Sequence, residues 1–158
     1  MKVLSSLAAM ALLFGSTGMA VAADSADGLV KTESPYPVAE TVQRFEKIAK
    51  KKGLTIFATV EHAKGAEKVD MTLRPTTVVI FGNPKGGTPF MQCEQSIGID
   101  LPLKALVWED ADGQTWMGYN DPAYIAERHG ASDCAAVQPI SKALAGLTKA
   151  TVAEKSGG

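Results

Sequence analysis

The chain has 158 residues, of which 46% are hydrophobic, and a formal net charge of −1. This length gives room for one domain built around a single hydrophobic core. The near balance of 16 basic and 17 acidic residues lacks the basic surface of a nucleic-acid-binding protein, and we therefore expect no nucleic-acid partner.

The first 23 residues have the three-part order of an export signal. A positive start at Lys2 precedes an apolar run at 3–14, and the small residues that follow predict cleavage after Ala22 or Ala23. The apolar run is shorter than the ~18 residues that a membrane span requires. We therefore expect a soluble periplasmic or secreted protein with no membrane insertion after signal cleavage.

A strand followed by a helix is predicted at the start of the mature chain. Residues 24–28 are a polar lead-in, and residues 29–32 begin the first strand. Pro37 suits the first turn of a helix and Gly53 suits its end. The apolar face of this helix recurs at the 3.6-residue period and consists of Val38, Val42, Phe45, Ile48 and Ala49.

Two further strands are predicted next. Residues 54–60 alternate between apolar and polar, which indicates a half-buried strand with one apolar face. Residues 76–81 form a β-branched and aromatic run bounded by Pro75 and Gly82, which indicates a central strand. The predicted apolar face of the first of these strands is Leu54, Ile56, Ala58 and Val60.

A hairpin is predicted from residues 105–109 and 114–119, because Gly113 supplies the positive φ that the connection needs. Asp121 and Pro122 suit the cap and first turn of a short helix that stops at Gly130.

The last helix is predicted to start near Ser132 or Asp133, and residues 154–158 are expected to be a disordered tail. Its buried stripe is Val137, Ile140, Leu144 and Leu147. The order of elements predicts a single α+β domain over residues 29–153, in which an antiparallel sheet has two longer helices packed on one face, plus short helices.

Residues 81–89 are the least ordinary segment, with three glycines and two prolines around Lys85. The composition favours a loop whose N–H groups point inward, with Thr88 capping a helix that Pro89 begins. Such a helix start binds anions, although a tight structural connection with a solvated lysine is the alternative. The order is not that of a nucleotide P-loop. The predicted ligand-binding residues here are Asn83, Lys85, Gly86, Gly87 and Thr88.

His62, beside Glu61 just past a predicted strand, is the better of two histidine candidates for a ligand or an acid/base role, and a structural hydrogen bond is the alternative. Spacing selects no set of three or four donors, so no metal site is predicted. His129 lies at a predicted helix C-terminus and is expected to be structural. Neither a nucleophile elbow nor a covalent haem motif is present.

Cys93 and Cys134 are the only cysteines. In an oxidising compartment they are expected to form a disulfide. Two buried free thiols or a redox-active pair are the alternatives, and the absence of a CxxC spacing disfavours the redox pair.

Four segments together resemble the uncharacterised family called domain of unknown function 302: residues 61–62, 81–92 (FGNPKGGTPFMQ), 99–110 (IDLPLKALVWED) and 118–130 (GYNDPAYIAERHG). The resemblance spans about residues 30–150. It implies a compact α+β domain that is often a homodimer and whose activity and cofactors are unknown. Positions typical of the family are His62, Asn83, Pro84, Gly87, Thr88, Pro89, Pro102 and Tyr119.

The leading expectation is an exported, homodimeric, non-enzymatic module that binds or senses a small molecule or an ion near His62 and residues 82–88, with Tyr119 as a further ligand-binding candidate. One alternative is a small periplasmic hydrolase or isomerase that uses His62 as its acid or base. Another is a purely structural dimerisation domain whose interface is the aromatic hairpin.

Overall fold

The computed structural model describes residues 28–154. The predicted export signal, almost all of the polar lead-in and most of the predicted tail lie outside the described residues. Within the described range, no helix combines the length and the hydropathy needed to cross a membrane.

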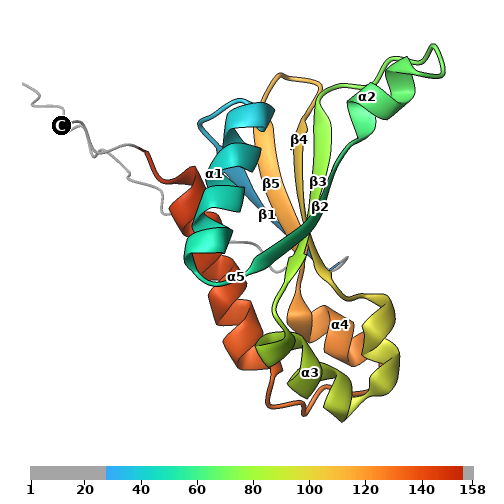
Figure 1. The fold of residues 1–158 in the computed structure, drawn as a ribbon, viewed down its shortest axis with the longest axis vertical. Helices are drawn as coiled ribbons and strands as arrows, with labels where there is room; N and C mark the ends of the chain where they lie inside the picture. The colour runs from blue at the N-terminus through green and yellow to red at the C-terminus, as the bar shows by residue number, and fades with distance from the viewer. Residues whose placement is uncertain (1–27, 155–158) are drawn as a thin grey trace, which may run out of the picture.

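A five-stranded antiparallel sheet with strand order β1-β5-β4-β3-β2 forms the centre of the fold (Figure 1). The strands are β1 (Leu29–Ser34), β2 (Thr55–Glu61), β3 (Thr76–Gly82), β4 (Leu103–Glu109) and β5 (Thr115–Asn120). The helices are α1 (Val38–Lys51), α2 (His62–Glu67), α3 (Pro84–Cys93), the 3₁₀ helix η1 (Gln95–Ile99), α4 (Pro122–Arg128) and α5 (Val137–Val152). The predicted α+β class is confirmed.

The hydrophobic core lies between the sheet and the helices α1 and α5, which pack together on the same side of the sheet (Figure 1). Val42 and Phe45 of the predicted α1 face are buried. The Phe45 ring meets Phe81 of β3 edge-on, with 4.9 Å between the ring centroids. Leu144 and Leu147 of α5 complete this layer. Each buried side chain of this kind stabilises the fold by about 1.5–3 kcal/mol.

Two predictions about chain reversals are confirmed. The β4–β5 hairpin turns through Gly113, whose φ is +81°. The Asp121 carboxylate accepts a hydrogen bond from the backbone N–H of Ala123 at 2.9 Å and so caps α4, which Gly130 follows with a φ of +67°. Both glycines adopt the left-handed conformation that other residues disfavour.

A β-bulge at Phe57 divides β2. Ile56 stands opposite Phe81 of the core-facing side, whereas Ala58 stands opposite Ile80 of the other side. Because the extra residue shifts the register, the side chains that follow change faces. The prediction that Leu54, Ile56, Ala58 and Val60 share one apolar face is therefore wrong. Beyond the bulge, Ala58 and Val60 lie on the opposite face of the sheet from Ile56.

The glycine-rich segment is a helix and not a loop. α3 begins at Pro84 with Asn83 as its N-cap, so the prediction that Thr88 caps a helix begun by Pro89 is wrong. The Asn83 Oδ1 atom accepts a hydrogen bond from the backbone N–H of Lys85 at 2.8 Å. An asparagine cap followed by a first-turn proline starts the helix one turn earlier than predicted.

Helix α5 begins later than predicted, at Val137 and not near Ser132 or Asp133. The residues before it make turns around Cys134, which is covalently bonded to Cys93. The cross-link holds this segment at the end of α3, and the helix starts only after it.

The face of the sheet turned away from α1 and α5 is called the outer face below. Trp108 of β4 and Trp116 of β5 stand opposite each other on it and stack with 6.4 Å between their ring centroids. The Lys31 ammonium lies 5.5 Å from the Trp116 ring centroid.

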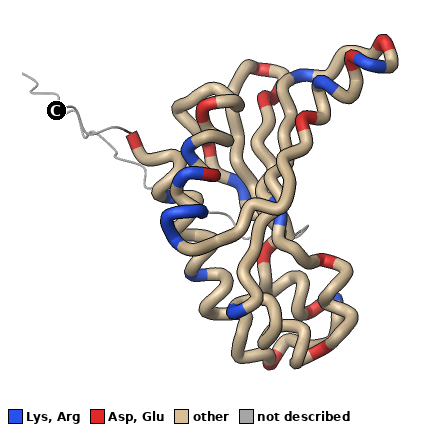
Figure 2. The backbone as a smooth tube through the Cα atoms, viewed as in Figure 1, with Lys and Arg blue, Asp and Glu red and all other residues tan. Residues whose placement is uncertain are grey.

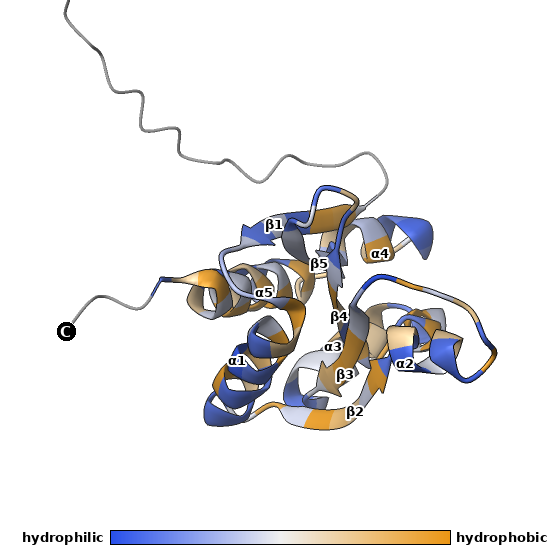
Figure 3. Cartoon of the chain, turned by 90° about the horizontal axis from the view of Figure 1, so that it is seen from above, coloured by the Kyte–Doolittle hydropathy of each residue, from blue (hydrophilic) through white to orange (hydrophobic). Residues whose placement is uncertain are grey.

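Residues 62–75, called the arm below, comprise α2 and the segment that follows it, and they project away from the sheet (Figures 1 and 3). Three apolar side chains near the tip face solvent: Val69 is 64% exposed, Met71 is 66% exposed and Leu73 is 47% exposed. Exposed apolar side chains grouped in this way mark an interaction surface more often than single ones do.

Candidate ligand-binding cavity

A cavity of about 490 Å³ opens between α3, η1 and α5, beside the ends of β2, β3 and β4. It is called the α3–α5 cavity below. Its volume is typical of small-molecule sites, and its lining is predominantly apolar. Its floor is made of the buried residues Phe81, Ile140, Leu144 and Leu147. Its rim includes the exposed residues Phe57, Pro84, Thr88, Pro102, Pro139 and Ala143.

Small residues leave room for this cavity on its α3 side. Gly86 and Gly87 both line it, and a Cβ atom added at Gly86 would meet no heavy atom within 4 Å. A Cβ atom at Gly87 would lie 3.6 Å from Leu101 Cδ1, which is an ordinary contact. Neither glycine has a positive φ. The two glycines therefore leave space on the cavity side of α3. Their backbone conformation does not require glycine.

The β-bulge supplies part of the rim. Phe57 is the unpaired residue of the bulge and is 56% exposed, and it lines the cavity. A Cβ atom at Gly82 would lie 3.5 Å from Phe57 Cε2, so the ring lies close to the end of β3. Bulges commonly redirect a side chain beside a site in this way.

The predicted disulfide is present in the structure. It joins Cys93, the last residue of α3, to Cys134 in the turns before α5, with 5.8 Å between the two Cα atoms. The two helices that face each other across the α3–α5 cavity are therefore linked covalently.

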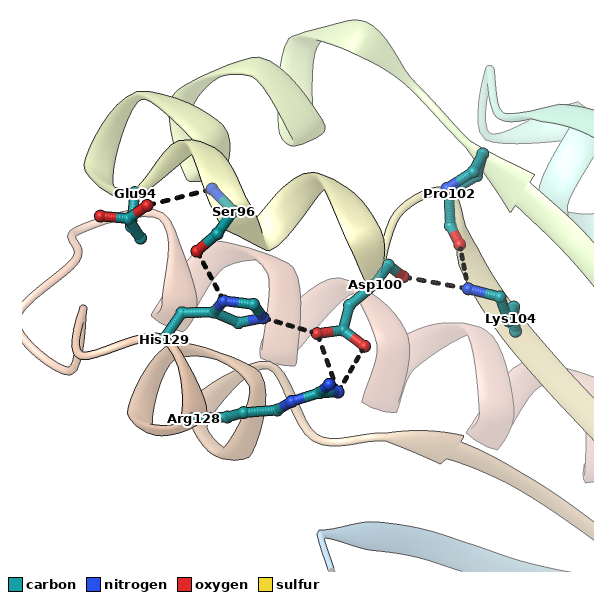
Figure 4. Close-up of polar contacts among 7 residues, drawn as sticks. All are labelled: Glu94, Ser96, Asp100, Pro102, Lys104, Arg128 and His129. Carbon is teal, nitrogen blue, oxygen red and sulfur yellow. Dashed lines mark hydrogen bonds and ion pairs between the residues drawn. The ribbon is translucent and has the colours of Figure 1, made fainter.

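A polar network fastens η1 to the end of α4 (Figure 4). His129 Nδ1 lies 2.8 Å from Ser96 Oγ, and His129 Nε2 lies 2.8 Å from Asp100 Oδ2. Arg128 adds an ion pair with the same carboxylate at 3.1 Å. Both ring nitrogens of His129 thus serve contacts between elements, in keeping with the structural role expected of it. Leu101, which follows Asp100 of this network, lines the cavity.

The structure brings some of the predicted site residues together and separates others. Asn83, Gly86, Gly87 and Thr88 line the α3–α5 cavity, and Lys85 lies on the same helical turn.

His62 lies at the opposite end of β2, because Thr55 pairs with Gly82 while Glu61 pairs with Thr77. At ~3.4 Å per residue, the two ends of the strand are about 20 Å apart. His62 and the glycine-rich segment therefore do not form one site.

Tyr119 is also outside the cavity lining. It is 8% exposed on the core-facing side of β5, and burial raises the pKa of its phenol. Packing in the core is sufficient to explain a tyrosine at this position, and a ligand-binding role is not needed to explain it.

The start of α3 has no free N–H groups to hold an anion. Pro84 has none, and the N–H of Lys85 bonds to the Asn83 side chain. The N–H groups of Gly86 and Gly87 both bond to the Asn83 carbonyl oxygen at 3.0 Å. The inward-pointing donors expected of an anion-binding loop are thus already used within the helix.

The α5 wall, Phe57, Met91 and the wall formed by residues 98–103 are parts of the cavity that were not predicted from the sequence. Ile140, Leu144 and Leu147 were predicted as an ordinary core stripe, and they are indeed buried. The available signal was Pro139 and Ala143 beside that stripe, two small exposed residues that extend it toward α3 without filling the space.

No titratable side chain is among the described residues that line the cavity. Among residues 28–154, no three His, Cys, Asp or Glu side chains gather closely enough to hold a metal ion. The contacts that the lining offers are therefore mostly apolar, with the Asn83 and Thr88 side chains as its polar groups.

The sequence profile of a family described as "Domain of unknown function DUF302" matches residues 30–147. Over 124 residues the chain is 44% identical to "Fluoride-specific ion channel FluC 1" of Brucella suis biovar 1 (strain 1330), a match that covers 77% of this chain and 49% of that protein. A protein of the same name from Brucella abortus biovar 1 (strain 9-941) is also 44% identical, with 46% of it covered. The chain thus spans about half the length of the curated relatives it matches.

Among solved structures, the chain resembles an uncharacterized conserved DUF302 protein from Bacillus stearothermophilus, with a TM-score of 0.72. The similarity covers 78% of this chain and 98% of that one at 17% sequence identity. At that identity it is the fold that is shared.

Proposed function

The chain belongs to the DUF302 family of domains of unknown function, and from this premise we propose that it is a non-enzymatic module that binds a small, largely apolar molecule in the α3–α5 cavity. The observation that carries the proposal is the cavity itself, about 490 Å³ in volume with a buried apolar floor. Apolar cavities of this size are the usual sites for small ligands.

An enzymatic role has less support. The catalytic candidate His62 is exposed and lies at the far end of β2 from the cavity. Ser96, His129 and Asp100 are in contact in the order found in a hydrolase relay. However, the backbone N–H of Ser96 is bonded to the Glu94 carboxylate at 3.1 Å. A negative charge beside the nucleophile opposes the oxyanion that ester hydrolysis forms.

Titration with Nile red, a neutral dye whose emission rises in apolar surroundings, tests the proposal. We expect saturable binding of one dye per chain. Ala143→Trp, which fills the rim from α5, should lower the affinity by at least about tenfold. The matched control is Ala145→Trp, because Ala145 is exposed on the same helix and does not line the cavity. Equal binding by the wild type and Ala143→Trp, or no binding at all, would overturn the proposal.

An ion is the second candidate ligand, because the curated relatives are fluoride channels by name. The donors at the start of α3 are already bonded, which disfavours it. Sodium fluoride and sodium chloride at equal ionic strength should give the same melting temperature. A shift specific to fluoride that Asn83→Ala abolishes would replace the apolar ligand by an ion.

Export and self-association are further parts of the proposal. The order of residues 1–23 supports export, and the exposed apolar side chains of the arm support a homodimer. The intact mass of protein recovered from the periplasm of its host should correspond to cleavage after Ala22 or Ala23. A mass that retains residues 1–23 would contradict export.

A further inference from the structure

We infer that the ligand of the α3–α5 cavity is an amphiphile with an anionic head, of the class of unbranched alkyl carboxylates. The inference rests on the proposed function and names the chemistry of its ligand. It depends on where the polar and charged groups lie around the cavity.

The depth of the cavity is apolar throughout. Phe81, Ile140, Leu144 and Leu147 form the floor, and each is at most 9% exposed. A charged group buried against them would lose its hydration without gaining a partner, which costs several kcal/mol. A ligand with a polar end must therefore keep that end at the rim, with its apolar part inside.

The charged residues that adjoin the lining decide the sign of that polar end. Direct chain neighbours of lining residues include Lys85, Asp100, Lys104 and Lys142. Asp100 is neutralised by Arg128 at 3.1 Å and faces His129 at 2.8 Å, on the side of η1 toward α4 (Figure 4).

Lys104 is also engaged, because its Nζ donates to the carbonyl oxygens of Asp100 and Pro102 at 3.2 and 3.1 Å. Of these four charged residues, Lys85 and Lys142 then remain as groups that could attract the polar end of a ligand. Both are exposed, and neither forms an ion pair with another residue of the described range.

Lys85 and Lys142 belong to α3 and α5, the two helices that face each other across the cavity, and each adjoins lining residues in the chain. Figure 2 shows basic positions on both of these helices and at the end of α1, whereas acidic positions collect on the other side of the lower part of the molecule. An apolar cavity with free ammonium groups at its rim is complementary to an alkyl chain that ends in a carboxylate.

Displacement of Nile red by dodecanoate, methyl dodecanoate and dodecyltrimethylammonium, each below its micelle concentration, tests this inference. We expect dodecanoate to bind about five- to tenfold more tightly than its neutral ester, and the cation to bind most weakly. Added salt should shrink the preference for the carboxylate, because it screens exposed charges.

The double variant Lys85→Ala/Lys142→Ala should lose the preference for the carboxylate while its affinity for the ester stays unchanged. The charge-matched control is Lys47→Ala/Lys68→Ala, since both lysines are exposed and neither adjoins the lining. Equal affinities of the wild type for acid and ester would overturn the inference and leave the cavity as a binding site. Failure of all three compounds and of the dye would overturn the proposed function itself.

Discussion

Cys93 and Cys134 join the end of one wall of the α3–α5 cavity to the beginning of the other. Cys93 ends α3, Cys134 precedes α5 by three residues, and their Cα atoms are 5.8 Å apart. Between them the chain passes through η1, the β4–β5 hairpin and α4. One covalent bond thus closes a loop that contains η1 and β4, and it ties together the two helices that face each other across the cavity.

Replacing both cysteines by serine should lower the free energy of unfolding by about 4 kcal/mol, because the bridge spans 41 residues and limits the freedom of the unfolded chain. Chemical denaturation measures this difference. The affinity for Nile red should fall as well, since α3 and α5 would no longer be tied. A reducing agent should affect the wild type and leave the serine variant unchanged, and equal stability of the two proteins without reductant would contradict the prediction.

Substitutions at Asn83 and Thr88 distinguish the observed start of α3, capped by Asn83, from the predicted start, capped by Thr88. Asn83→Ala removes the cap bond to Lys85 and the 3.0 Å bond from Asn83 Nδ2 to the Gly53 carbonyl oxygen, and it should cost about 1–2 kcal/mol. Thr88→Ala should change stability by no more than about 0.5 kcal/mol, because Thr88 is an exposed helical residue. Thermal denaturation of the two variants gives both values, and a larger loss at Thr88 would favour the later start.

Most of the fold was predictable from the sequence. The apolar periodicity of α1 and α5 reflects burial on one side, β3 is a β-branched and aromatic run bounded by Pro75 and Gly82, and Gly113 indicates the hairpin turn. The features that the patterns did not predict are the start of α3 and the bulge in β2. At α3, two proline starts were present, and the asparagine before Pro84 makes the earlier one the stronger. The bulge at Phe57 left the alternation of residue types intact while it turned the later side chains over.

The cavity could be predicted only in part, because it is formed by residues distant in the sequence. Gly86 and Gly87 stood out through their composition, whereas Pro139 and Ala143 acquire their meaning only when α5 lies across from α3. His62 stood out through its chemistry. It follows β2 and the glycines follow β3, and because antiparallel neighbours end at opposite edges of a sheet, the predicted antiparallel sheet already implied their separation.

Asp110 should make stability depend on pH in the acid range. Its carboxylate accepts a hydrogen bond from the Trp116 indole N–H at 2.7 Å and others from the backbone of Gln114 and Asp112, and these bonds lower its pKa, with the indole bond contributing most. A carboxyl whose pKa is lower in the folded state stabilises the fold above its unfolded pKa, and loses that contribution as the pH falls through the folded value.

The difference in unfolding free energy between the wild type and Asp110→Asn should therefore be constant near neutral pH and shrink below about pH 4. Denaturation curves recorded from neutral to acid pH measure it. Glu109→Gln is a suitable control, because Glu109 precedes Asp110 in the chain and its side chain has no such contact with Trp116. A difference that grows on acidification would contradict the assigned sign.

The exposed arm should mediate self-association. Met71→Asp places a charge among three exposed apolar side chains and should convert a dimer to a monomer, as measured by light scattering after gel filtration. Thr72→Asp adds the same charge at the neighbouring exposed position and should leave the mass unchanged. A monomeric wild type at micromolar concentrations would remove the dimer from the proposal.

The positions of the two tryptophans determine what intrinsic emission can report. Trp108 and Trp116 stack on the outer face, and neither lines the α3–α5 cavity, which opens on the other side of the sheet. Their signal is therefore insensitive to a molecule entering the cavity and sensitive to whatever approaches the outer face. A spectrum of the unmodified protein can thus distinguish a partner that covers the sheet from a ligand that enters between the helices, two events that a melting curve would register alike.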